Sequence, residues 1–91
     1  MLRRMPPSAL QERDPYLLAL GAQIRHLRQQ QGWNQDEFAA RAGMHRTHPT
    51  KLENGQLDPR LSTLRRVAAV FGLPVAALLP SVSSDQEEPL R

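Results

Sequence analysis

The side chains of this 91-residue chain that could do chemistry are mainly arginines and amides, and most lie between residues 16 and 80. That segment carries eight basic and four acidic residues, a net charge of +4, and Lys51 is the only lysine of the chain. The planar arginine side chain can donate two parallel hydrogen bonds to a phosphate or to a guanine edge. The charge balance therefore suits a polyanionic partner, although a modest basic excess is also common among ordinary globular domains.

The sequence lacks the residue patterns that catalytic sites require. The chain has no cysteine, which excludes thiolate nucleophiles, disulfides and cysteine-based zinc sites. It also shows no nucleophile–base motif, no paired carboxylates and no glycine-rich phosphate loop. We therefore expect no enzyme, no cofactor and no metal site. No apolar run approaches the roughly 20 residues of a membrane helix, so we expect a cytoplasmic protein.

The elements that must position these side chains are predicted to be helices. Apolar residues recur at steps of three and four, and no segment alternates as a strand does, so we predict an all-α fold of five helices. Asn34 and Glu37 have the spacing of a capping box, and a glycine follows each of the first four helices. The expected ranges are 16–31, 35–42, 45–54, 60–71 and 74–79.

The periodic segment is framed by two short ends. Residues 1–15 contain three prolines and scattered charges without an apolar period, which predicts a flexible N-terminal arm. Residues 81–91 offer little to bury, which predicts a disordered C-terminal tail. The single domain is therefore residues 16–80. A chain of this size buries only about 60% of its unfolded surface, which favours oligomerisation.

The second and third predicted helices have the spacing of a helix-turn-helix motif. Two helices that cross steeply need a small residue where they touch, which is Ala39, and a glycine where the chain reverses, which is Gly43. Three large apolar side chains are expected to fill the wedge between the two helices: Phe38, Met44 and Leu52. The pattern therefore predicts a DNA-binding element of two helices.

The run LGAQIRHLRQQQGWNQDEFAARAGMHRT, continued by KLENGQLDPRLSTLRRVAAVFGLPVAALL, resembles the lambda-repressor-like Cro/CI (XRE) family of DNA-binding regulators. The resemblance covers about residues 20–79 and implies a five-helix lambda-repressor-like bundle. The letters HRT at the start of the third helix also resemble controller proteins of restriction–modification systems. The resemblance implies a regulator of transcription that binds double-stranded DNA.

The same resemblance implies roles for individual residues. Gln35, with Asn34 beside it, matches the start of a helix that lies across the phosphate backbone, where the helix N-terminus adds partial positive charge. Asn54 matches a position that contacts the backbone. The third helix is expected in the major groove, with Arg46 as the best candidate for guanine. The residues expected to face DNA there are His45, Arg46, Thr47, His48, Thr50 and Lys51.

The resemblance also implies a salt bridge between Arg28 of the first helix and Glu53 of the third. We expect this pair to be partly buried and to lock the two helices together. Loss of one partner would then cost more stability than the pair itself contributes, because a buried charge would be left unpaired.

Several of these residues allow a plainer interpretation. Arg46 is either a base contact or a solvated arginine. Trp33 is either a stacking platform for a base or, as we expect, part of the core. His45 and His48 have the spacing of two metal ligands, but no third ligand is positioned nearby, so we expect no metal there.

Pro49 is the departure from the family pattern, which prefers Ile, Leu or Val as the inward anchor of the third helix. Proline donates no N–H, clashes with the carbonyl four residues back, and disfavours a helical conformation at His48. The chain avoids most of this penalty if the helix starts late, with Thr47 or His48 as N-cap and Pro49 in the first turn. Such a helix has about six residues and leaves Arg46 and Thr47 on a loop.

Two functions remain open from the sequence. The first is a regulator that binds duplex DNA as a homodimer, held together through the fifth helix by Val75, Leu78 and Leu79. The second is an antitoxin or protein-interaction adaptor on the same scaffold, in which Pro49 weakens DNA reading and the tail binds a protein partner.

Overall fold

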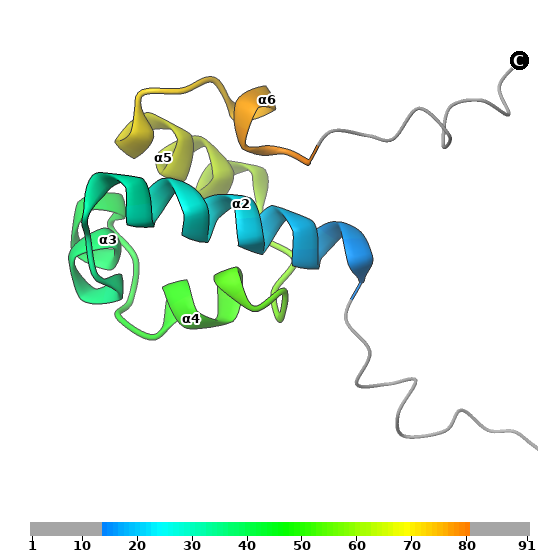
Figure 1. Cartoon of the computed structure of the whole chain (residues 1–91), viewed down its shortest axis with the longest axis horizontal. Helices are drawn as coiled ribbons and strands as arrows, with labels where there is room; N and C mark the ends of the chain where they lie inside the picture. The colour runs from blue at the N-terminus through cyan, green and yellow to red at the C-terminus, as the bar shows by residue number, and fades with distance from the viewer. Residues whose placement is uncertain (1–13, 81–91) are drawn as a thin grey trace, which may run out of the picture.

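The computed structural model describes residues 14–80, and within them the fold has five α-helices and no strand (Figure 1). The all-α prediction is therefore confirmed. Residues 1–13 and 81–91, with most of the predicted arm and the whole predicted tail, lie outside the described residues. Across residues 14–80 no helix has the length and apolarity needed to cross a membrane. The helices are α2 (Pro15–Gln31), α3 (Gln35–Ala42), α4 (His48–Glu53), α5 (Leu61–Phe71) and α6 (Val75–Leu78).

The first described helix, α2, begins one residue earlier than the sequence predicts. Pro15 is its first residue and so belongs to the helix rather than to the predicted arm. Proline fits there because its missing N–H would have no partner in the first turn. Asp14 caps the helix, since its Oδ1 accepts a hydrogen bond from the Tyr16 N–H at 2.7 Å. The helix ends as predicted at Gly32, whose φ of 78° is left-handed.

The predicted capping box starts α3. The Glu37 N–H donates to Asn34 Oδ1 and the Asn34 N–H donates to Glu37 Oε1, each at 2.8 Å. At the other end Gly43 has a φ of 67°, which reverses the chain toward α4. The following Met44 N–H donates to the Ala39 carbonyl at 2.8 Å, which closes the turn. The predicted helix-turn-helix geometry is therefore present.

The third predicted helix starts late. The range 45–54 was wrong at its beginning, because α4 runs only over the six residues His48–Glu53 with Thr47 as its N-cap. Pro49 occupies the second position, where its missing N–H and its ring do no harm. The residues before it form a turn in which the His48 N–H donates to the His45 carbonyl at 2.9 Å. The late-start alternative is thus confirmed, and Arg46 lies outside the helix.

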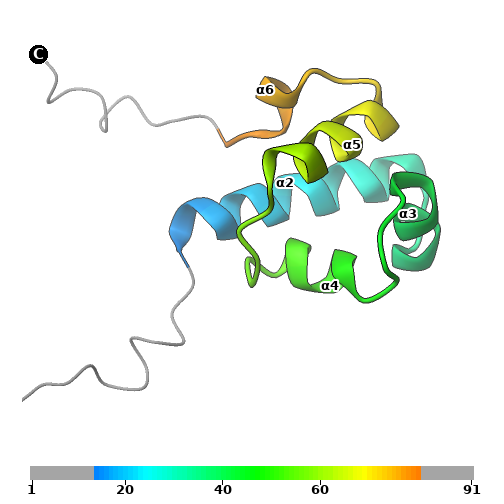
Figure 2. The same ribbon diagram turned by 180° about the vertical axis from the view of Figure 1, so that it is seen from behind.

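The helices pack as layers around α2. Both views show α4 on one side of α2 and α5 with α6 on the other, while α3 closes one end (Figure 1, Figure 2). Ala39, at the predicted crossing, is 2% exposed. The core between the helices consists of side chains that are at most 3% exposed, among them Leu20, Ile24, Phe38, Leu52, Val67 and Leu78.

The last two helices differ slightly from their predicted ranges. Arg60 is the N-cap of α5 rather than its first residue, and Pro74 is the N-cap of α6 rather than part of its first turn. Leu78 is fully buried, and Val75 and Leu79 pack partly buried against the same core. The expectation that these three apolar residues hold a homodimer together was therefore wrong for Leu78, which is enclosed within its own protomer.

Trp33 packs, partly buried, against the core, which agrees with the core position that the sequence predicted. Its ring stacks on Phe71 with centroids 5.7 Å apart. The Arg41 guanidinium lies 4.6 Å from the centroid of the same ring, within cation–π range. The indole is thus packed among residues of the domain and braces the end of α2 against α5.

Gly21 allows α2 to approach α4 closely, a feature that the sequence analysis missed. A Cβ atom at this position would lie 2.4 Å from the Glu53 carbonyl oxygen and 2.6 Å from that of Leu52. Both atoms are backbone, so they cannot rotate away as the tip of a flexible side chain would. Any larger residue would push the end of α4 away from α2.

We therefore predict that Gly21→Ala destabilises the domain. Helix propensity alone would favour alanine by about 1 kcal/mol, but overpacking against backbone should cost about 1 to 3 kcal/mol net. Thermal and urea unfolding would measure the change, with the exposed α2 variant Gln29→Ala as control. An unchanged or raised unfolding temperature for Gly21→Ala would contradict the close approach.

Candidate nucleic-acid interface

The residues predicted to read DNA lie together on α4 and on the turn before it. The side chains of residues 45–47, in the turn, are all exposed. On α4, Thr50 and Lys51 are exposed, while His48 at its start and Asn54 just after its end are partly buried. The structure thus places the predicted base-reading residues on one continuous segment at the surface.

The inward side of α4 fixes which residues face outward. Pro49, Leu52 and Glu53 are buried, and Pro49 is among the largest side chains that are fully enclosed. Proline therefore fills the anchor position that the family gives to a branched aliphatic residue. With these three residues inward, the helical period leaves Thr50 and Lys51 on the solvent side.

The turn before α4 is held by a histidine. His45 Nδ1 accepts a hydrogen bond from the Thr47 N–H at 3.2 Å and lies 2.9 Å from the Thr47 hydroxyl oxygen. Because this nitrogen accepts an amide hydrogen, the neutral ring carries its proton on Nε2.

Within residues 14–80 no three His, Cys, Asp or Glu side chains form a group that could hold a metal ion.

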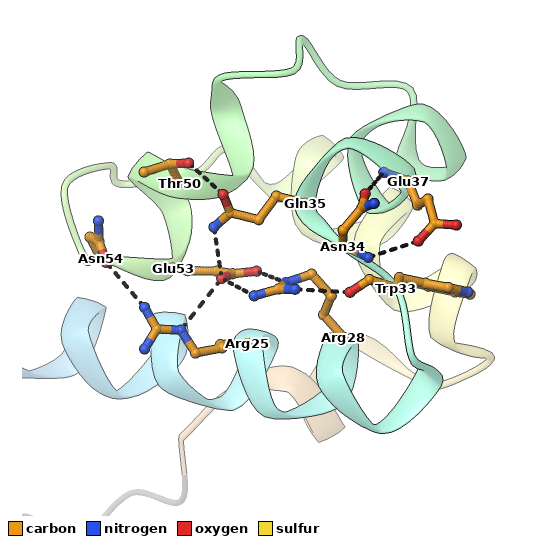
Figure 3. A network of polar contacts seen from close by, with 9 residues as sticks. All are labelled: Arg25, Arg28, Trp33, Asn34, Gln35, Glu37, Thr50, Glu53 and Asn54. Carbon is orange, nitrogen blue, oxygen red and sulfur yellow. Dashed lines mark hydrogen bonds and ion pairs between the residues drawn. The ribbon is translucent and has the colours of Figure 1, made fainter.

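The predicted salt bridge between Arg28 and Glu53 is present and buried (Figure 3). Arg28 Nε donates to Glu53 Oε2 at 2.6 Å and Arg28 Nη2 donates to Oε1 at 3.0 Å, while its Nη1 donates to the Trp33 carbonyl at 2.9 Å. The Glu53 carboxylate has no exposed surface. This two-point contact is the geometry in which an arginine best compensates a desolvated carboxylate.

Gln35 links this buried pair to the outward face of α4. Its Nε2 donates to Glu53 Oε1 at 3.2 Å, and its Oε1 accepts from the Thr50 hydroxyl at 2.8 Å (Figure 3). The sequence predicted both Gln35 and Thr50 as DNA contacts, whereas the structure also gives them this bond to each other. One amide hydrogen of Gln35 is left for an outside acceptor. The bond also sets how α3 lies against α4.

Arg25 of α2 is a neighbour of the interface that sequence reasoning missed. Its Nε lies 3.5 Å from Glu53 Oε1, and its Nη2 donates to Asn54 Oδ1 at 3.4 Å (Figure 3). The available signal was its place three residues before Arg28, which puts both arginines on one face of α2. Asn34, in contrast, uses its side chain oxygen to cap α3.

Comparison with protein-family models gives the family. Residues 19–80 match the model described as a helix-turn-helix domain, which is more than half of the chain. The chain belongs to the helix-turn-helix domain family. Its motif is formed by α3 and α4, and the residues predicted to contact DNA lie on these two helices, at their ends and in the turn between them.

Known proteins similar to this chain are regulators. It is 30% identical over 70 residues to the cryptic phage CTXphi transcriptional repressor RstR of Vibrio cholerae. The matched segment covers 77% of this chain and 63% of that repressor. It is 28% identical over 71 residues to the immunity repressor protein of Bacillus phage phi105, and this match covers 78% of this chain and 49% of that repressor. The helix-turn-helix chain thus spans about half to two thirds of these relatives.

A solved structure shows the same architecture. The restriction–modification controller protein C.AhdI from Aeromonas hydrophila superposes with a TM-score of 0.67 at 25% identity, covering 69% of this chain and 96% of that one. Together with the repressor relatives, this similarity confirms the resemblance to the Cro/CI family of regulators. None of these three named proteins is described as an enzyme.

The buried pair gives a stability prediction. Arg28→Met keeps much of the side-chain volume but leaves the enclosed Glu53 carboxylate without its two-point partner, which should cost about 3 to 5 kcal/mol. Arg65→Met, on the exposed face of α5, should change stability by less than about 0.5 kcal/mol. Chemical unfolding of both variants measures the difference. Equal stabilities would show that the buried pair does not hold the fold.

Proposed function

We propose that this protein is a transcriptional regulator that binds duplex DNA in a sequence-specific way, with α4 and the turn before it in the major groove. The observation that carries the proposal is the arrangement of α4. Its buried side is fixed by Pro49, Leu52 and Glu53, so its exposed side is presented in one orientation. Side chains held in one orientation on a helix and on the turn before it are what reading of base edges requires.

The proposal divides the residues by task. Arg46 reads guanine from the exposed turn, because its fork matches the two acceptors on that base edge. Other residues of this segment contact bases or nearby phosphates, namely His45, Thr47, His48, Thr50 and Lys51. Asn34, Gln35 and Asn54 contact the phosphate backbone and set the register on the duplex. The free N–H groups at the start of α3 favour phosphate there.

Pro49 changes the manner of reading rather than preventing it. The antitoxin or adaptor alternative rested on a proline that spoils the recognition helix, with the tail after Pro80 as partner site. Pro49 is instead buried as an anchor, and the tail lies outside the described residues. DNA binding is therefore the function that the geometry favours, and it assigns the protein to the cytoplasm, where bacterial and phage DNA is read.

Replacement of Arg46 tests the proposal. Duplexes selected from a random pool by the wild-type protein would give the preferred sequence. Arg46→Ala should lower the preference for that sequence by about tenfold or more, which corresponds to one lost bidentate contact, and should lower non-specific binding much less. Arg65→Ala, on the face of α5, is the control for loss of one positive charge. Failure of the wild-type protein to select any sequence would contradict the proposal.

We further propose that the regulator is a homodimer that uses α6 together with α2. Between these helices lies a hollow of about 760 Å³ lined by one polar residue, Gln23, and by five small or apolar ones, which are Ala19, Ala22, Ala76, Leu79 and Pro80. Small side chains let a second copy approach the backbone closely. A symmetric pair would place two copies of α4 about 34 Å apart, on half-sites one turn apart.

Ala76→Glu tests the dimer without disturbing the core, because Ala76 is exposed on α6. A charge in this hollow should shift the protein to a monomer and weaken binding to a two-half-site duplex far more than to a single half-site. Sedimentation equilibrium gives the mass, and Ala69→Glu on the exposed face of α5 is the control. A dimer that persists in Ala76→Glu would exclude this interface.

A further inference from the structure

The cluster around Glu53 contains one more positive charge than the buried carboxylate needs. Arg28 reaches both carboxylate oxygens, at 2.6 and 3.0 Å, and its side chain is 12% exposed. Arg25 stands farther off, 3.5 Å from Oε1, and its side chain is 48% exposed. Arg28 therefore compensates the carboxylate, and Arg25 leaves the cluster with a net charge of +1.

The contacts of Arg25 are too weak for its role to be the stabilisation of the fold. Both of its polar contacts are long, at 3.5 Å to Glu53 and 3.4 Å to Asn54. Half-exposed ion pairs at such distances contribute little to stability. They do, however, hold the guanidinium beside Asn54 at the end of α4. The Arg25 side chain is therefore positioned at the surface and keeps hydrogen-bond donors for another partner.

The atoms left at this surface are donors. The oxygen atoms of the cluster already accept: Glu53 Oε1 and Oε2 accept from Arg28, and Asn54 Oδ1 accepts from Arg25. A guanidinium has five N–H donors and an amide nitrogen has two, so Arg25 Nη1 and Asn54 Nδ2 keep hydrogens for an outside partner. Adjacent donors in a cluster with a net positive charge suit an anionic oxygen ligand, which is the chemistry of a phosphodiester.

We propose that Arg25 contacts a DNA phosphate together with Asn54, so that α2 holds the duplex in addition to the two helices of the motif. This inference rests on the proposed function, because the phosphate is one of the duplex that α4 reads. The place fits, since Arg25 reaches the end of α4 (Figure 3), whereas α5 lies on the far side of α2 (Figure 1, Figure 2). The contact carries no sequence information and fixes register instead.

Salt-dependent binding to a mixed-sequence duplex tests the contact. The probe is a labelled duplex of about 30 base pairs, titrated by fluorescence anisotropy between about 50 and 200 mM salt. Arg25→Ala should weaken binding by about threefold to tenfold on every duplex tested and reduce the slope of log affinity against log salt by about 1. Arg25→Lys keeps the charge and should recover most of the slope.

Arg65→Ala on α5 is the matched control, because it removes the same charge from the opposite side of α2 and should change the slope by much less. Unfolding temperatures of all variants, measured in parallel, separate a loss of contact from a loss of fold. An Arg25→Ala slope equal to that of Arg65→Ala, in a protein that binds the duplex, would overturn the contact and leave the proposed function standing. A wild-type protein that binds no duplex would overturn the proposed function itself.

Discussion

The arrangement of the helices in this small domain depends on one fully buried carboxylate, that of Glu53. Removing an ion from water costs several kcal/mol, so Glu53 can be buried only where donors meet it on every side. Those donors are Arg28 from α2, at 2.6 and 3.0 Å, and Gln35 from α3, at 3.2 Å. Because the partners stand on different helices, pairing this one charge fixes how α2, α3 and α4 lie relative to one another. The exposed face of α4 is therefore set by a requirement of its buried face.

Much of the architecture followed from local rules in the sequence. The capping box of α3 and the left-handed glycines at the helix ends depend only on neighbours in the chain, so their positions were predictable. The pairing of Arg28 with Glu53 came from the family resemblance and is confirmed. The start of the third helix was expected at residue 45, which was wrong, and the observed start is the alternative offered by the physical argument against proline inside a helix.

Features that depend on distance in space rather than along the chain were not predictable. In the sequence Gly21 is simply a residue of low helix propensity. Only the packed structure shows that a Cβ atom at this position would lie 2.4 Å from the Glu53 carbonyl oxygen. The bond from Thr50 to Gln35 joins two side chains that the sequence had assigned separately to DNA. Likewise, Leu78 looked available for a partner until the fold enclosed it. Each case is decided by which helix lies opposite.

The central claim is that the face organised by Glu53 is the surface that meets DNA. An NMR titration that follows each backbone amide while duplex DNA is added tests it most directly. The account predicts the largest shifts at the start of α3, across residues 45–54 and at Arg25, with small shifts along the exposed side of α5. Largest shifts on α5 and α6, with α4 unchanged at saturation, would contradict it.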